Sequence, residues 1–302
     1  MVRRLQDMTL TLFVQSVLAG LTNGFVYGLI GLGIAVVYRG ARIINAMQGD
    51  FALLGGVAAY LALTRLGVPM LLAYCTGVIA GGALGFIVER LLIRPTDRRG
   101  GTDDSYLLVT LGGAFAVSAA VLLYFGRDSH VLEGIGGNAS IDVFDAAIRV
   151  HAVWLIVISS AVVIGLKLFY SYTRLGQAML AASIDIEGSL TIGINVPLMR
   201  ILTFVLGGMM GGLAGILVAP LINIYYEMGL LLTLKGFAAA ILGGLTSPFG
   251  AIFGGVTLGL IESLAIVSVS SGYKDVIAMA ILILIMILMP QGLLGRRGRQ
   301  GG

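Results

Sequence analysis

Most of the chain consists of apolar stretches about 20 residues long, separated by short polar or basic segments. A helix needs roughly 20 apolar residues to cross about 30 Å of hydrocarbon, so each stretch of this length predicts a membrane-spanning helix. Six such stretches are found at 12–37, 43–64, 68–92, 105–125, 151–170 and 200–221. A further span is predicted from Val276 to Met289.

The stretch 231–269 is also apolar, but its pattern is broken. Four residues that interrupt helices lie in its first half: Gly243, Gly244, Pro248 and Gly250. The stretch therefore contains either two short spans that meet at the sequence TSPFG, or a re-entrant hairpin followed by a span. Together these patterns predict eight to nine transmembrane helices, with a broken or re-entrant segment near 231–250.

Composition agrees with an all-α polytopic membrane protein. The 302 residues are 58% hydrophobic and only 11% charged, with a mean hydropathy of +1.01, far outside the range of soluble proteins. The 45 glycines allow helices to approach closely in the bilayer. Residues 1–302 are expected to form one transmembrane domain. Cys75 is the only cysteine, which excludes an intramolecular disulfide, and its apolar surroundings in the sequence predict a small packing residue.

The distribution of basic residues predicts which ends of the spans face the cytoplasm. Basic clusters follow the third and fifth apolar stretches and end the chain: Arg90, Arg94, Arg98 and Arg99, then Lys167 and Arg174, then Arg296, Arg297 and Arg299. The positive-inside rule places all three clusters, and a tail at 291–302, in the cytoplasm. The segment 126–150 contains four acidic residues and is expected to be an external loop, with the sequence IDVFDAAIRV at the membrane interface.

The N-terminal segment begins with basic residues followed by an apolar stretch, as in a signal peptide. Its apolar character continues through Val37, which is longer than a signal sequence, so we interpret it as the first span. Counting spans backwards from Arg90 places the N-terminus outside, whereas Arg3 and Arg4 favour the opposite orientation.

Motifs of several enzyme classes do not occur in the sequence. None of the three lysines closes a phosphate-binding G-x-x-x-x-G-K-[ST] loop, so any ATP energy must come from another chain. His130 and His151 form no H-E-x-x-H pair, and no G-x-S-x-G motif is present. The basic residues gather at span ends rather than along one face, which argues against nucleic acid as a partner. We therefore expect a non-enzymatic protein without cofactor or metal.

Four polar residues inside apolar stretches are candidates for a translocation pathway. Asn45, Gln48 and Asp50 occur together in INAMQGDFALLGG, and Glu262 lies in GGVTLGLIESLA. Ionisable groups are costly within a membrane and mark functional positions, and kinked backbone beside Gly49 would expose further polar groups. The alternative is structural: Asn45 and Gln48 would be interfacial, and Glu262 would form a buried hydrogen bond that clasps helices.

The segment 171–199 is the other exception to the apolar pattern. Its sequence TRLGQAMLAASIDIEGSLTIGINVP has a helical pattern, is mildly polar, and lies on the predicted cytoplasmic side. It is either an amphipathic helix on the lipid surface or a docking element for a partner subunit. Lipid-surface helices carry several basic residues, whereas this one offers small and acidic residues, which favours a protein contact.

Four blocks of this sequence resemble the permease subunits of branched-chain amino-acid ABC importers, of the LivH type. In chain order they are INAMQGDFALLGGVAAY, then LGQAMLAASIDIEGSLTIGIN leading into LTFVLGGMMGGLAGIL, then GGLTSPFGAIFGGVTLGLIESLA, and finally YKDVIAMAILILIMILMPQGLLGR. Their order and spacing match the family over roughly 250 residues. No single block is specific, but four in register make the resemblance strong.

The resemblance implies a multi-pass subunit of the inner (plasma) membrane. Its implied partners are a second permease of the LivM type, two cytosolic ABC ATPases and a periplasmic or extracellular substrate-binding protein. The segment 171–199 then corresponds to the ATPase-coupling region, and six residues fall on the family pattern: Gly176, Ala178, Ala181, Asp185, Gly193 and Ile194. Gln177 departs from it, since an Arg is usual there, and so do Glu187 and Gly188, where a small residue such as Ala is common.

The implied mechanism is alternating access driven by the ATPases, with the substrate passing polar groups such as Asn45 and Gln48. Substrates of such permeases include leucine, isoleucine and valine, other amino acids, urea and short amides. The alternative function is an ion-coupled secondary carrier or a channel for small amides, in which Asp50 and Glu262 would bind the coupling ion. Co-purification of an ATPase distinguishes these functions.

Overall fold

The structure is a computed structural model of the whole chain, described here for residues 2–137, 139–143, 146–268, 280 and 283–284. The predicted span Val276–Met289 and the predicted tail 291–302 lie outside the continuous described regions. The helices are α1 (Val2–Ala41), α2 (Gln48–Arg65), α3 (Met70–Val88), a π-helical turn η1 (Glu89–Ile93), α4 (Arg94–Arg98), α5 (Asp103–Phe125), α6 (Val150–Tyr172), α7 (Arg174–Ile184), α8 (Ile186–Thr191), α9 (Val196–Ile222), α10 (Met228–Gly243) and α11 (Pro248–Ser268).

Six helical segments of the described chain are long and apolar enough to cross a membrane. They are Thr11–Ala41, Met70–Arg98, Asp103–Phe125, Val150–Tyr172, Val196–Ile222 and Pro248–Ala265. The prediction of a helical polytopic membrane protein is therefore confirmed. The predicted total of eight to nine spans would require two or all three of α2, the shorter α10 and 276–289 to cross as well, and that number remains a prediction.

The predicted interruption near TSPFG is where helix α10 ends and helix α11 begins. Gly244 has a φ of +95°, a backbone conformation that a side chain disfavours, and it ends α10. The Ser247 hydroxyl then accepts a hydrogen bond from the Gly250 amide at 3.1 Å and caps the start of α11. The two helices pack against each other, and whether they form a re-entrant hairpin remains a prediction.

Glycine rows determine how the helices pack. On α1, Gly20, Gly24 and Gly28 recur every fourth residue, and added Cβ atoms there would approach the α11 backbone at 2.6–3.0 Å. A second row lies on α3: added Cβ atoms at Gly81 and Gly85 would collide with the α9 backbone, and one at Gly77 would meet the α2 backbone and the Ile216 side chain of α9. Helices α1 with α11 and α3 with α9 form the two most extensive contacts. The expectation that glycine richness reflects close helix packing is confirmed.

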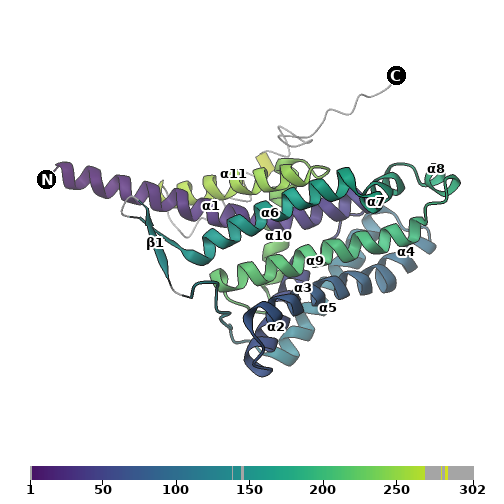
Figure 1. Cartoon of the computed structure of the whole chain (residues 1–302), viewed down its shortest axis with the longest axis horizontal. Coiled ribbons are helices and arrows are strands. Elements are labelled where there is room, and N and C mark those ends of the chain that lie inside the picture. Colours follow the sequence, from purple (N-terminus) through teal and green to yellow (C-terminus); the bar gives the residue numbers. More distant parts are fainter. Residues whose placement is uncertain (1, 138, 144–145, 269–279, 281–282, 285–302) are drawn as a thin grey trace, which may run out of the picture.

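Two segments of short elements, a β-hairpin and a pair of helices, lie at opposite ends of the long axis (Figure 1). At one end, strands β1 (Ser140–Val143) and β2 (Ala146–Arg149) form an antiparallel pair, an element that the all-α prediction lacked. The Gln15 side chain on α1 holds this hairpin through two hydrogen bonds to Ala147, of 3.0 and 3.2 Å. The other end carries α7, α8 and α4 (Figure 1). The hairpin lies within 126–150, and α7–α8 within 171–199.

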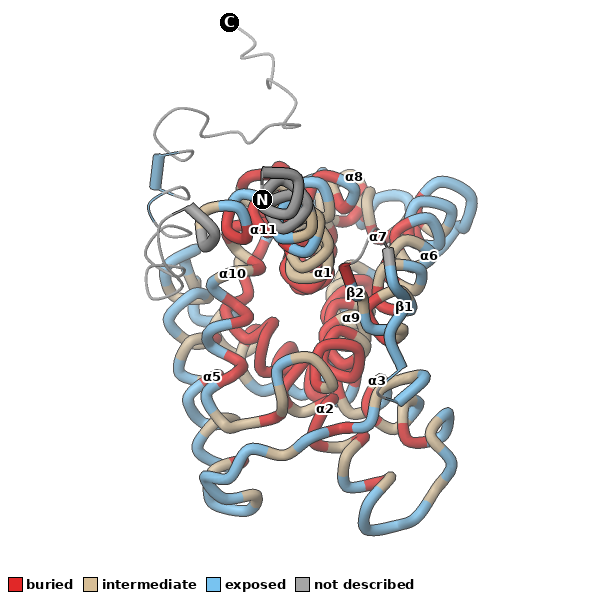
Figure 2. Tube along the Cα trace, turned by 90° about the vertical axis from the view of Figure 1, so that its left-hand side faces the viewer, coloured by how far each residue is buried: buried red, intermediate tan, exposed pale blue. Residues whose placement is uncertain are grey.

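Burial separates an inner group of helices from an outer one. Buried residues line α1, α2 and α9, whereas α5 carries many exposed positions on the outside (Figure 2). Exposed apolar side chains such as Leu123 on α5 and Ile164 on α6 suit contact with lipid or with another subunit. Cys75 is exposed on α3, so the prediction that it is a packing residue is wrong. An apolar sequence neighbourhood does not reveal which side of a membrane helix faces the protein.

Candidate translocation site and coupling segment

A non-helical break between α1 and α2 positions the polar residues predicted from INAMQGD. The chain leaves α1 after Ala41, and Arg42 has a φ of +56°. The Asn45 side chain accepts a hydrogen bond from the Met47 amide at 3.1 Å, which folds the turn that precedes α2. The Ala46 amide in turn donates to the Thr110 hydroxyl on α5 at 3.1 Å. The part of the break from Asn45 to Met47 is buried, so the backbone polar groups there depend on these side-chain partners.

Gln48 occupies a space that glycines leave open. Its Nε2 donates to the Gly207 carbonyl oxygen on α9 at 2.9 Å, and its side chain is fully buried. A Cβ on Gly33 of α1 would collide with the same amide group, and one on Gly211 of α9 would lie 3.0 Å from Nε2. Gln48 therefore joins α1, α2 and α9 at one point, and its Oε1 has no hydrogen-bond partner among the described residues.

Asp50 lies one half turn further along α2 and faces α5 and α10. The Ser118 hydroxyl donates to its Oδ1 at 3.1 Å, while Oδ2 is buried without a hydrogen-bond partner in the described chain. No described Lys or Arg forms an ion pair with it. Gly229, in the first turn of α10, makes room for this carboxylate, since an added Cβ would lie 2.6 Å from Oδ1. The Gly49 amide also binds α10, at 2.8 Å from the Thr233 hydroxyl oxygen.

Glu262 belongs to a different cluster. Its Oε1 accepts from the Lys235 ammonium at 3.1 Å, and that ammonium also donates to the Tyr27 hydroxyl at 3.0 Å. The ammonium lies 4.9 Å from the centre of the Tyr27 ring. The three residues connect α1, α10 and α11. The sequence analysis singled out neither Tyr27 nor Lys235, although a lysine inside an apolar stretch opposite a glutamate is a signal for such a pair.

A second charged network, also missed from the sequence, lies at the start of α9. Arg200 binds Glu89 on η1 at 3.1 Å and Asp97 on α4 at 2.7 Å. Asp97 also accepts from the Tyr106 hydroxyl of α5 at 2.9 Å. Glu89 is fully buried and lies on a π-helical turn, a local distortion that is frequent at functional sites. The network therefore connects α9 with the two helical segments, η1 and α4, that carry most of the Arg90–Arg99 cluster.

Side-chain caps divide the predicted coupling segment into two short helices. The Thr173 hydroxyl accepts from the Gly176 amide at 3.0 Å at the start of α7, and the Asp185 carboxylate accepts from the Gly188 amide at 2.9 Å at the start of α8. Gly193, with a φ of +82°, then turns the chain. The Asn195 side chain accepts from the Leu198 amide at 3.1 Å at the start of α9, only five residues before Arg200.

The residues on the family pattern in this segment have different surroundings. Gly176 is buried, because an added Cβ would collide with the Phe169 carbonyl of α6, and Ala178 and Ile194 pack against the hydrophobic core. Ala181 is half-buried, while Asp185 and Gly193 are exposed. The most exposed aliphatic side chains of the segment are Ile184, Ile186, Leu190 and Ile192, with exposed fractions of 55–74%. They form a further docking candidate that the sequence analysis did not single out.

The fold defines a multi-pass membrane protein: its helices pack through glycines, buried polar groups lie at a break in the interior, and a short helical segment lies at one end. The chain belongs to a family described as "Branched-chain amino acid transport system / permease component", which it matches over residues 16–286. The family confirms the prediction of a transport subunit rather than an enzyme, and of a component of a larger transport system.

Individual relatives agree with the family. The chain is 33% identical over 301 residues to the high-affinity branched-chain amino acid transport system permease protein BraD of Pseudomonas aeruginosa, covering 94% of this chain and 96% of BraD. It is 31% identical over 303 residues to LivH of Escherichia coli K12, with the same coverage, and 28% identical over 281 residues to a probable LivH of Methanocaldococcus jannaschii, covering 88% of each chain. No solved structure matches the chain.

Proposed function

We propose that this chain is the membrane-spanning permease subunit of an ATP-driven importer in the inner (plasma) membrane. Its substrates are branched-chain or related amino acids, delivered by a binding protein outside the membrane. The names of BraD and LivH, which match almost the whole chain, support this substrate class. The partners are a second, LivM-type permease, two cytosolic ABC ATPases and the binding protein.

The observation that carries the proposal is the exposed apolar surface of α7 and α8. Ile184, Ile186, Leu190 and Ile192 are exposed in a segment outside the six spans, where the rest of the described chain leaves them largely uncovered. Exposed apolar side chains gathered on one segment mark protein contact sites. This segment and the β-hairpin lie at opposite ends of the molecule, which supports a cytoplasmic coupling segment within 171–199 and an external loop within 126–150 (Figure 1).

The coupling segment is connected to the spans at both of its ends. Gly176 packs on the α6 backbone, so α7 moves with the end of α6. At the other end, the chain passes directly into α9, whose Arg200 binds Glu89 and Asp97. A displacement of α7 and α8 by the ATPases therefore reaches α6 and α9, and through α9 the glycine-packed α3. Such coupled helix shifts are the mechanical basis of alternating access.

In this proposal, the substrate pathway passes the polar break between α1 and α2. Asn45, Gln48 and Asp50 each present one buried polar atom without a partner in the described chain: Nδ2, Oε1 and Oδ2. These atoms are available to a zwitterionic substrate when the helices separate, with the Asp50 carboxylate facing its ammonium group. Glu262 is the weakest of the four pathway candidates, because its charge is already matched by Lys235.

The proposal is tested by co-expressing the chain with its second permease and the ATPases and measuring ATPase recovery and amino-acid uptake into vesicles. The double substitution Ile186→Asp with Ile192→Asp is expected to abolish ATPase co-purification and uptake, because two charges would replace apolar contacts. Ile141→Asp is the matched control. This isoleucine is 46% exposed on the hairpin at the opposite end, and its substitution leaves ATPase recovery unchanged.

A second substitution separates the capping role of Asp185 from a charge contact. Asp185→Asn keeps the cap on the Gly188 amide, whereas Asp185→Ala removes it, at a cost of about 1 kcal/mol to α8. Uptake lost only in the alanine variant identifies α8 as an element that must be folded for coupling.

Full ATPase recovery with both isoleucines, Ile186 and Ile192, replaced would contradict the proposal. Uptake driven by an ion gradient without ATPase would favour the secondary carrier.

A further inference from the structure

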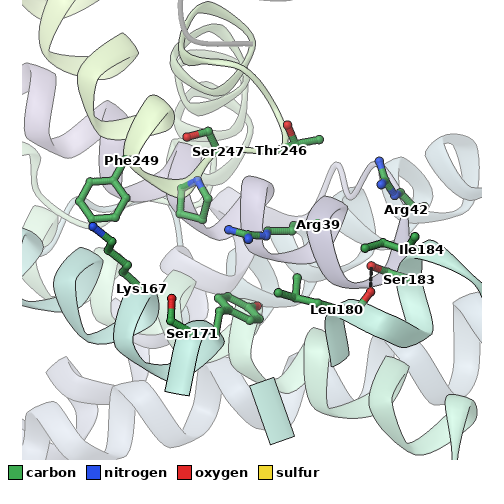
Figure 3. A pocket seen from close by; sticks show the side chains of 12 residues that line it. Arg39, Arg42, Lys167, Ser171, Leu180, Ser183, Ile184, Thr246, Ser247 and Phe249 are labelled. Atoms are coloured by element: carbon green, nitrogen blue, oxygen red, sulfur yellow. Dashed lines mark hydrogen bonds between the residues drawn. The ribbon is translucent and has the colours of Figure 1, made fainter. Parts of the chain in front are cut away.

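A cavity of about 490 Å³ lies at the end of the molecule that carries α7. It opens between the C-terminal ends of α1 and α6, the face of α7 and the start of α11 (Figure 3). The side chains from these elements that bear on its chemistry are Arg39 and Arg42 of α1 and the following turn, Lys167 and Tyr170 of α6, and Ser247 and Phe249 at α11. Ile184 of the proposed ATPase-contacting surface lies at its edge, but the charged and hydroxyl groups of the cavity have no role in the proposed transport function.

The cavity gathers positive charge without acidic partners. Arg39, Arg42 and Lys167 line it, while no described Asp or Glu does, and none of the three forms an ion pair within the described chain. Their contacts are with aromatic rings instead. The Arg39 guanidinium lies 5.2 Å from the centre of the Tyr170 ring, and the Lys167 ammonium lies 5.3 Å from that of Phe249. These cation–π contacts hold the cations in place but leave their charge uncompensated.

A buried hydroxyl in the lining also lacks a partner. Tyr170 is only 4% exposed, and no described group forms a hydrogen bond with its hydroxyl. A buried polar group in that state is costly, and it indicates a partner that the protein itself does not supply. Ser171, Thr246 and Ser247 add hydroxyls to the same cavity, and the start of α11 directs the positive end of its dipole there. The cavity is therefore built for an oxygen-rich anion.

We propose that this cavity binds the phosphate group of an anionic phospholipid at the cytoplasmic surface of the membrane. Guanidinium, ammonium and hydroxyl donors match the several acceptor oxygens of a phosphate. The same end of the molecule has the basic residues expected at the cytoplasmic surface, where anionic lipids attract Lys and Arg.

The surroundings of the cavity favour a lipid over a soluble phosphate. Ile164 lies one helical turn from Lys167 on α6 and is 54% exposed, and Phe253 lies one turn from Phe249 on α11 and is 52% exposed. Both turns lead away from the α7 end towards the middle of the spans. Because Lys167 and Phe249 touch across the gap, the two apolar faces adjoin and form a track for an acyl chain below the phosphate.

The test uses the full-length chain assembled with its partner subunits, and measures binding of phosphatidylglycerol supplied in mixed vesicles, by native mass spectrometry and by titration. The double substitution Arg39→Gln with Lys167→Gln is expected to weaken phosphatidylglycerol binding about 30-fold, since each basic residue near an anionic surface contributes a factor of about five. Arg127→Gln is the matched control. It removes an exposed cation from the predicted external loop 126–150, away from the cytoplasmic surface, and it leaves the binding unchanged.

Tyr170→Phe removes one oxygen and no charge. Because the hydroxyl has no partner in the protein, the substitution is neutral for an empty cavity, but it weakens phosphatidylglycerol binding about tenfold if the hydroxyl donates to phosphate. Equal phosphatidylglycerol binding by the parent chain and all three variants would overturn the proposal. Displacement of the lipid by millimolar inorganic phosphate would also overturn it, because the ligand would then be soluble. A third contrary result is that the lipid leaves when the ATPases bind and that Lys167 crosslinks to an acidic ATPase residue.

Discussion

Asp50 and Glu262 are two buried carboxylates inside a membrane protein, and the structure treats them differently. They are 0% and 1% exposed, and each lies within a helix of an apolar sequence. Glu262 is 3.1 Å from the Lys235 ammonium, which the Tyr27 hydroxyl also contacts. Asp50 has only the Ser118 hydroxyl, and no described Lys or Arg forms an ion pair with it.

The difference distinguishes a structural charge from a functional one. A buried ion pair whose members lie on separate helices fixes how those helices pack, and here it joins α1, α10 and α11. A carboxylate without a cation contributes nothing comparable to stability, because its desolvation is not offset. Its presence at a break next to Asn45 and Gln48 is better explained by contact with a substrate. The comparison therefore ranks Asp50 above Glu262 as a pathway residue.

The largest expected effect is that of removing the cation from the Glu262 cluster. Lys235→Met leaves the Glu262 carboxylate buried without its countercharge, and breaking such a pair costs about 3–5 kcal/mol. We expect a lower yield of folded protein and a lower unfolding temperature in detergent. The double variant Lys235→Met with Glu262→Met is expected to recover most of the loss. A stable single variant would show that the pair does not clasp the helices.

Asp50→Asn is expected to lower uptake without lowering stability. The amide keeps an oxygen for Ser118 and removes an uncompensated buried charge, so the unfolding temperature stays equal or rises. If the carboxylate contacts the ammonium group of the substrate, uptake falls at least about tenfold, the equivalent of about 1.4 kcal/mol. Vesicle uptake and thermal unfolding are measured on the same preparation. Unchanged uptake would remove Asp50 from the pathway and make both carboxylates structural.

The membrane class, the positions of five continuous spans and the break after Gly243 followed from the sequence, because hydropathy and helix-breaking residues act locally. The predicted span 43–64 corresponds to α2, which is not among the six membrane-capable helices, and the sixth of these, Pro248–Ala265, lies in the second half of the broken stretch 231–269. The pairing of helices did not. The glycine rows at Gly20–Gly28 and Gly77–Gly85 are visible in the sequence, but only the fold shows that the first faces α11 and the second α9. The hairpin at 140–149 was also missed, since its two strands are short and lie next to α6.

The candidate site was also predicted only in part, because residues that are far apart in the sequence meet only in the fold. Asn45, Gln48 and Asp50 are close in sequence, so their grouping could be seen in advance. Glu262 was grouped with them because an isolated sequence position does not show its spatial partner. Lys235 lies 27 residues away from it, on a different helix. Long-range partners of polar residues are thus what the sequence pattern cannot supply.

Gly229→Ala tests whether Asp50 needs its close fit against α10. An added Cβ would lie 2.6 Å from the Asp50 carboxylate oxygen, in a fully packed region, and overpacking of this kind costs about 1–3 kcal/mol. Gly112→Ala on α5 is the matched control, since nothing lies within 4 Å of its Cβ, and we expect it to be neutral or stabilising. Thermal unfolding compares the two. An equal effect of both substitutions would mean that Asp50 adjusts freely, contrary to the close packing described above.

Ser118→Ala isolates the side-chain hydrogen bond that Asp50 receives. Removing the hydroxyl is expected to lower the free energy of unfolding by about 1.5–3 kcal/mol if Asp50 is charged. The loss is about 1 kcal/mol if Asp50 is protonated. Ser159→Ala on α6 is the control, because that hydroxyl is fully buried without a partner in the described chain, so its removal is neutral or stabilising. A double-mutant cycle of Ser118→Ala with Asp50→Asn measures the coupling directly. Zero coupling would mean that the bond contributes nothing to holding the carboxylate, and the contrast with the firmly held Glu262 would then be larger still.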